Sequence, residues 1–169
     1  MNIKSCEIEL GEVEIRQQMD RHVADIRTSF LDIEGLSIAI EEGRAYITCT
    51  LNPFLSPRTP GVVELGLKPN KDGKSVDVEL LSVTAKVTAL GCIDLNFDGD
   101  KTKNMICDAI KKKFEGQSWF AINDRTITVN LEAIMQGKGV SISGCLVAAD
   151  ICDDKICLSW ERRVEAQYE

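Results

Sequence analysis

Hydrophobic residues recur every three or four positions in two segments of the chain, which is the spacing of one face of an α-helix. In the first segment, residues 11–31, these positions are Ile15, Met19, Val23, Ile26 and Phe30. In the second, about 101–116, they are Met105, Ile106, Ala109, Ile110 and Phe114. The sequence therefore predicts a long N-terminal helix and a second helix, each with one apolar face.

In the remaining segments apolar and polar residues alternate, which is the pattern of strands with one buried face. A short strand is predicted at residues 3–10. A hairpin is predicted at 36–51 around the turn Glu41 to Arg44, and further strands at 63–67 and 76–87 flank the turn Asn70 to Gly73. The chain ends in another hairpin, with its turn at Asp150 to Asp154. About eight antiparallel strands result.

The predicted strand 76–87 changes its apolar face in the middle. Val76, Val78 and Leu80 share one parity, whereas Leu81, Val83, Ala85 and Val87 share the other. Such a switch requires a β-bulge or a change of partner strand between residues 80 and 81. A strand that bends in this way favours an α+β fold in which a strongly curved antiparallel sheet wraps around the long N-terminal helix, beside the second helix.

The length of 169 residues fits a single domain over residues 1–169. A helix followed by antiparallel strands occurs twice, in about 1–90 and 91–162, and a polar tail follows at 163–169. The net charge is −7 and no basic cluster is dense enough to neutralise several phosphates, so nucleic acid is not an expected partner.

Membrane insertion and export are not expected either. No run approaches the roughly 20 apolar residues that span a bilayer, and the N-terminus MNIKSCEIELGEVEIRQQ lacks a signal-peptide core. The seven cysteines are an odd number without CxxC spacing, which suits a reducing compartment. The sequence thus predicts a cytoplasmic protein without a transmembrane segment.

Asp94, Asn96 and Asp98 resemble the start of a calcium-binding loop. The EF-hand motif also needs a preceding helix, a hydrophobic residue at position 8 and a glutamate at position 12, where this chain has Lys101 and Met105. We therefore interpret the segment as a half-buried strand with its acids facing water, and no metal site is expected there.

Catalytic chemistry is not indicated by the remaining candidates. His22 lies beside the apolar stripe of the first helix, where pairing with Asp25 explains it better than a role as base. Cys145, Cys152 and Cys157 lack a fourth zinc ligand. GxSxG, P-loop, HExxH and GxGxxG motifs are absent from the sequence, which predicts a protein that is not an enzyme and has no cofactor.

The order of elements resembles a known family. The carrying segments are L-x-I-x-I-E-E-G-R-x-Y-I-x-x-x-L (36–51), V-E-L-L-S-V-x-A (78–85), I-T-V-N-L-E-A-I (127–134), G-V-S-I-S-G (139–144) and D-D-K-I-C-L (153–158). They are similar to the bacterial LmeA-like phospholipid-binding proteins of the tubular lipid-binding (TULIP) superfamily. The resemblance implies a TULIP-like curved sheet around a helix, an apolar groove, lipid binding and no catalysis. Those proteins are exported or anchored, which is not expected of this chain.

A fatty acid or phospholipid in a groove between helix and sheet would contact inward-facing apolar residues. The candidates are Met19, Val23, Ile26, Ile38, Ile47, Val78, Leu80, Val83 and Leu146. The same pattern also suits a closed core, in which case the chain would be a protein-interaction or self-assembly module, with a homodimer as one outcome. Phe54 and Leu55, in the proline-rich loop 52–61, fit a lid, a membrane-touching tip or plain loop anchoring.

Overall fold

The computed structural model describes residues 4–22, 25–53, 58–89, 93–96, 99–139, 141 and 143–162. Within these residues, antiparallel strands dominate and three helices accompany them, which confirms the α+β class. The strands form a large sheet and a separate three-stranded sheet. The division of the chain into domains or halves stays a prediction.

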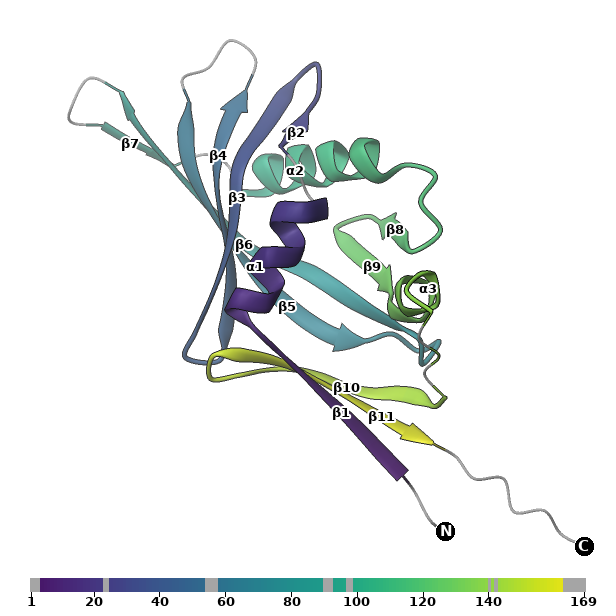
Figure 1. Cartoon of the computed structure of the whole chain (residues 1–169). Helices are drawn as coiled ribbons and strands as arrows, with labels where there is room; N and C mark the ends of the chain where they lie inside the picture. The colour runs from purple at the N-terminus through teal and green to yellow at the C-terminus, as the bar shows by residue number, and fades with distance from the viewer. Residues whose placement is uncertain are drawn as a thin grey trace, which may run out of the picture.

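The large sheet is strongly curved and resembles half of a barrel (Figure 1). Its strands follow the order β2-β3-β4-β5-β6-β9-β8, and β7 pairs with the far end of β6. Their bounds are β2 Ile26–Arg27, β3 Leu31–Glu41, β4 Arg44–Pro53, β5 Thr59–Pro69, β6 Ser75–Ala89, β7 Ile93–Asn96, β8 Phe120–Asn123 and β9 Thr126–Asn130. The predicted hairpins are therefore confirmed.

The small sheet joins the two ends of the described chain. β1 (Lys4–Gly11) pairs with β11 (Lys155–Arg162), which also pairs with β10 (Cys145–Cys152). β10 packs on β5 of the large sheet. Two backbone hydrogen bonds join the sheets, because the N–H of Leu146 donates to the carbonyl of Gly73 at 2.7 Å and the N–H of Gly43 donates to that of Asp153 at 3.1 Å.

The three helices are α1 (Glu12–His22), α2 (Gly99–Phe114) and α3 (Leu131–Gly137). α2 lies across the concave side of the large sheet, where it contacts β2, β3, β6 and β8 (Figure 1). α1 contacts β3. α3 begins with an N-cap, since the side chain of Asn130 accepts a hydrogen bond from the N–H of Ala133. The predicted second helix is confirmed.

The predicted long N-terminal helix is wrong in its second half. α1 ends at His22, and Ile26 belongs to β2, where it pairs with Ile33. A local turn excludes helix at this point: the hydroxyl of Thr28 donates to the carbonyl of Leu31 and accepts from its N–H, at 2.7 and 3.0 Å. Such side-chain bonds compete with helical backbone bonds. The sheet therefore wraps around α2, which is the longer helix, rather than around a long α1.

The change of face in β6 is confirmed as both a bulge and a change of partner. Glu64 of β5 opposes Ser82, but the next residue, Leu65, opposes Leu80, so Leu81 is an extra residue in β6. β9 pairs with residues 75–79 of this strand and β7 with residues 86–89. Leu80 is consequently buried, whereas Leu81 is 49% exposed.

This pair of neighbouring leucines allows a matched test of the bulge. We expect Leu80→Ala to lower the free energy of unfolding by about 2–5 kcal/mol, because it leaves a cavity in the core. Leu81→Ala should cost well below that, since surface truncations usually change stability by about 0.5 kcal/mol or less. Urea unfolding of the two variants and the parent measures both values. Equal losses would contradict the assignment of Leu81 to the bulge.

Candidate functional site

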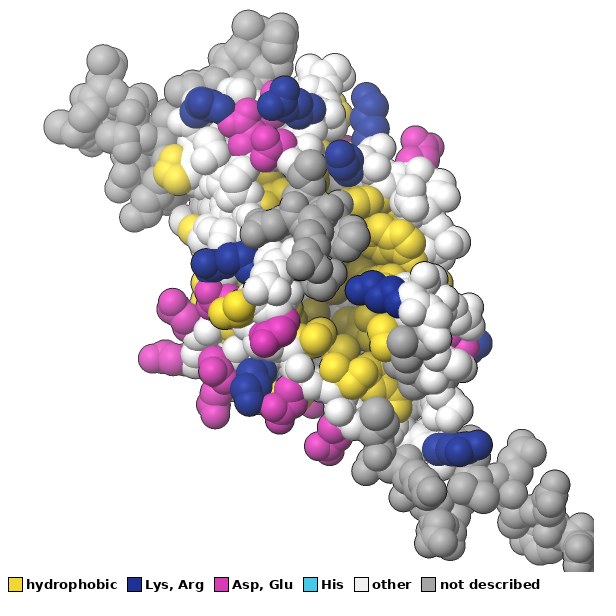
Figure 2. Space-filling model, in the orientation of Figure 1, with side chains coloured by type: hydrophobic (Ala, Val, Ile, Leu, Met, Phe, Trp, Pro, Cys, Tyr) yellow, Lys and Arg dark blue, Asp and Glu magenta, His cyan; other side chains and the backbone are white. Residues whose placement is uncertain are grey.

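An apolar cavity of about 170 Å³ lies between the concave face of the large sheet and α2. Every residue around it carries an apolar side chain or a thiol. Strands supply ten of them: Ile26, Ile33, Leu36, Ile47, Cys49, Val63, Leu65, Val78, Leu80 and Ile127. Helices supply the other four: Met19, Ile106, Ile110 and Phe114. Figure 2 shows hydrophobic side chains gathered in a hollow between α1 and the β8–β9 hairpin.

The spacing of residues on α2 explains how this helix supplies three of the residues that line the cavity. Ile106, Ile110 and Phe114 are four residues apart, so they form one row along the helix and point to the same side. At the C-terminal end of the row, the ring of Phe114 contacts those of Trp119 and Phe120, each with ring centres 5.3 Å away. This aromatic cluster fixes the end of the helix beside the cavity.

The structure brings five of the predicted ligand-binding residues to this cavity. They are Met19, Ile26, Ile47, Val78 and Leu80. Val83 does not line the cavity, but it packs against the core cluster that includes Ile26 and Leu80. Val23 and the loop residues Phe54 and Leu55 lie outside the described residues.

Two further predicted residues pack elsewhere. Ile38 belongs to a cluster with Ile40 and Ala45 beneath α1, and Leu146 belongs to the cluster between the small sheet and β6. Ile38 opposes the cavity residue Ile47, so it lies on the same face of the sheet, but it packs beneath α1 beside the cavity. The register of β3 shifts between Glu34 and Ser37. Gly35, which lies inside this shift, has a φ of 61°, a backbone conformation that glycine adopts without strain.

The cavity residues that the sequence-based prediction missed lie mainly on α2 and β5. The stripe of Ile106, Ile110 and Phe114 was visible in the sequence, but we expected the N-terminal helix to cover the concave face. Val63 and Leu65 carried the alternation of a strand, which indicates burial but not what a strand faces. A signal for the cavity itself was absent, because volume depends on how elements pack rather than on pattern.

Among the described residues that line the cavity, Cys49 is the one with a titratable group, and it is 8% exposed. Burial raises the pKa of its thiol from 9.0 to about 11. The thiolate is the nucleophilic form of cysteine, so this group is protonated and inert at neutral pH. Cys49 thus acts as a small apolar part of the wall.

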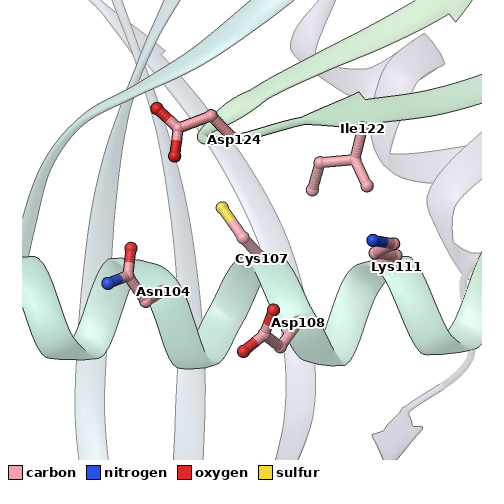
Figure 3. Close-up of a pocket in the computed structure, with 6 residues that line it drawn as sticks. All are labelled: Asn104, Cys107, Asp108, Lys111, Ile122 and Asp124. Carbon is pink, nitrogen blue, oxygen red and sulfur yellow. The ribbon is translucent and has the colours of Figure 1, made fainter.

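A second, larger recess of about 370 Å³ lies on the other side of α2 and is polar (Figure 3). Asn104, Asp108 and Lys111 border it from the helix, and Asp124 borders it from the turn between β8 and β9. The sulfur of Cys107 points towards Asp124 in this view. Burial, and to a smaller extent the charge of Asp108, raise the pKa of the Cys107 thiol.

The polar recess is less suited to an apolar ligand than the smaller cavity. Binding there would desolvate the charged groups of Asp108, Lys111 and Asp124, which is costly unless the ligand pairs with each of them. A raised pKa also opposes a nucleophilic role for Cys107. The apolar cavity is therefore the candidate site.

Asp94 and Asn96, considered as calcium ligands, lie on β7, which pairs with β6, and Asp98 lies outside the described residues. In the part of the chain that the structure describes, three or more His, Cys, Asp or Glu side chains do not gather into a group that could hold a metal ion. His22 is the last residue of α1. Among the described helices, none is long and apolar enough to cross a membrane.

Comparison of the chain with protein-family models, with curated proteins and with solved structures finds no match. The function is therefore inferred from the geometry of the cavity.

The raised pKa of Cys49 predicts a loss of stability at alkaline pH. Between pH 9.0 and about 11, the unfolded chain loses this proton while the folded chain keeps it, so the free energy of unfolding falls as the pH rises. The slope approaches about 1.4 kcal/mol per pH unit for one group. Urea unfolding from pH 8 to pH 11 measures it.

Cys49→Ala is the control, because it removes this one titration and leaves those of the other cysteines. The stability difference between parent and variant should narrow as the pH rises through that range. Parallel curves would show that Cys49 is accessible to water and that the cavity wall is not dry.

Proposed function

We propose that this protein binds a small apolar ligand, such as part of a fatty acid or phospholipid chain, in the cavity between the curved sheet and α2. One observation carries the proposal: a cavity of about 170 Å³ inside the fold is lined by apolar side chains and one protonated thiol. Ligand sites are typically apolar hollows of this kind, with few polar groups.

The volume limits what the cavity can take. Pockets for drug-sized ligands usually measure about 300–1,000 Å³, whereas an apolar cavity of about 150 Å³ accepts benzene. A whole phospholipid is therefore too large. The ligand would place an acyl segment or a ring in the cavity, and the remainder would leave through the hollow seen in Figure 2.

Leaving such a space empty is unfavourable. An enclosed apolar void of about 170 Å³ would cost on the order of 4 kcal/mol at about 24 cal/mol per Å³. The hollow on one side lowers this cost, because water can reach part of the wall. A bound apolar group would restore the missing contacts, and the gain favours binding.

The proposed role is binding without catalysis. A catalytic site needs a nucleophile or base within reach of the substrate. Among the described lining residues, the one titratable group is a thiol whose pKa is raised to about 11. Relationship to the LmeA-like proteins and the TULIP superfamily is part of the proposal. Its support is the sequence resemblance together with a curved sheet that holds an apolar cavity.

Native mass spectrometry of the purified protein, before and after addition of decanoate, is the direct test. We expect a one-to-one adduct that disappears on denaturation, and solvent extraction identifies any molecule that co-purifies. A clean mass without uptake of decanoate would contradict the proposal. It would favour the alternative of an interaction or self-assembly module whose function lies on its surface.

Filling the cavity should abolish uptake. Ile110→Trp extends a larger side chain from α2 into the cavity, and we expect the affinity for decanoate to fall at least about ten-fold, or ~1.4 kcal/mol. Ile122→Trp is the matched control, because Ile122 borders the polar recess and is not among the residues that line the cavity. Isothermal titration calorimetry measures both variants. Equal affinity of the two would place decanoate outside this cavity.

A further inference from the structure

Two cysteines lie side by side on the solvent-facing side of the small sheet. Cys152 ends β10, and the turn of Asp153 and Asp154 connects it to β11. Cys152 opposes Lys155 in the register of this hairpin, and Cys157 lies two residues further along β11. Side chains two residues apart point to the same face of a sheet, so Cys152 and Cys157 are diagonal neighbours on one face.

The two thiols also interact directly. The side chain of Cys152 is the largest cause that raises the pKa of Cys157 to about 11. Cys152 is exposed, whereas Cys157 is half-buried. An exposed thiol can meet a reagent from solution, and a protected neighbour can then complete the reaction.

We propose that Cys152 and Cys157 are an oxidisable dithiol, which a small-molecule disulfide converts into an intramolecular disulfide across the β10–β11 hairpin. This inference is independent of the proposed ligand binding.

The reaction is a thiol–disulfide exchange in two steps. The Cys152 sulfur, after losing its proton to solvent, attacks one sulfur of the reagent and displaces the other half as a thiolate. Once Cys152 is held in the mixed disulfide, its thiol no longer raises the pKa of Cys157. The Cys157 sulfur then loses its proton to solvent and attacks the Cys152 sulfur, and the second half of the reagent leaves as a thiolate. Both cysteines are oxidised, and the reagent is reduced to two thiols.

The hairpin geometry predicts that this disulfide is reversible. Diagonal neighbours have Cα atoms about 7–8 Å apart, whereas a disulfide prefers about 4.4–6.8 Å. The end of the hairpin must therefore close slightly, which Cys152 can follow because it is the last residue of its strand. A strained, exposed disulfide is more easily reduced than a relaxed structural one.

The experiment uses an uncharged reagent because acids surround the pair. Glu9 opposes Cys157 in the sheet, and Asp150, Asp153 and Asp154 flank Cys152. The folded protein is treated with bis(2-hydroxyethyl) disulfide, remaining thiols are alkylated, and the chain is cut with trypsin. Cleavage after Lys138, Lys155 and Arg162 places Cys152 in residues 139–155 and Cys157 in residues 156–162.

We expect these two peptides to be linked, the total mass of the protein to fall by two hydrogen atoms, and dithiothreitol to reverse both changes. Cys145 lies in the first peptide and is also exposed, so Cys145→Ser is the matched control and should retain the link. In Cys157→Ser, the second step is lost and the hydroxyethyl adduct should accumulate on Cys152.

Two results would overturn the proposal. One is a parent protein that accumulates the adduct on Cys152 to the same level as Cys157→Ser, because Cys157 would then not react with it. The other is loss of the link in Cys145→Ser, because the disulfide would then involve Cys145.

Discussion

The apolar concave face of the large sheet must be kept from water, and the arrangement of the other elements follows from how it is covered. α2 lies across this face and α1 packs on another part of it, and a helix is too straight to fill a curved surface along its whole length. The core cluster closes around Ile106 and Ala109, whose exposures are 4% and 0%. Where helix and sheet diverge, the cavity of about 170 Å³ remains.

The bulge at Leu81 allows β6 to take part in this enclosure. Before the bulge, Val78 and Leu80 face the cavity. After it, Val83 packs against the same cluster although its position has the opposite parity. One extra residue thus keeps the apolar side chains of a long strand on the concave side while the strand bends. Without it, the second half of β6 would turn its apolar side chains towards water.

The sequence was sufficient for these local features and insufficient for the way they assemble. Alternation in 76–87 located the bulge because parity is a property of one strand, and the spacing from Met105 to Phe114 located α2 for the same reason. The prediction of a helix failed at residues 25–31, because Ile26 and Phe30 continue the helical spacing by coincidence. The hydrogen bonds of Thr28 with Leu31 decide that segment, and no periodicity reports them.

Part of the cavity lining was predicted, because few apolar positions of the chain face inward. Met19, Ile26, Ile47, Val78 and Leu80 had to face some part of a core, and they line the cavity. Ile38 and Leu146 had the same pattern but pack in separate clusters. Ile38 faces the same side as Ile47 but packs beneath α1, and Leu146 belongs to the second sheet. Both placements depend on how segments far apart in sequence pack together.

Met19 contacts both the cavity and the β10–β11 hairpin, which carries Cys152 and Cys157. It lines the cavity, and it packs against the cluster that also contains Ile151 and Ile156. Those two isoleucines directly precede Cys152 and Cys157, and their side chains point to the opposite face of the hairpin. The two cysteines therefore face solvent, whereas the two isoleucines beside them in sequence face the cluster beneath α1. Coupling between them requires that this cluster have two arrangements, since contact alone transmits no free energy.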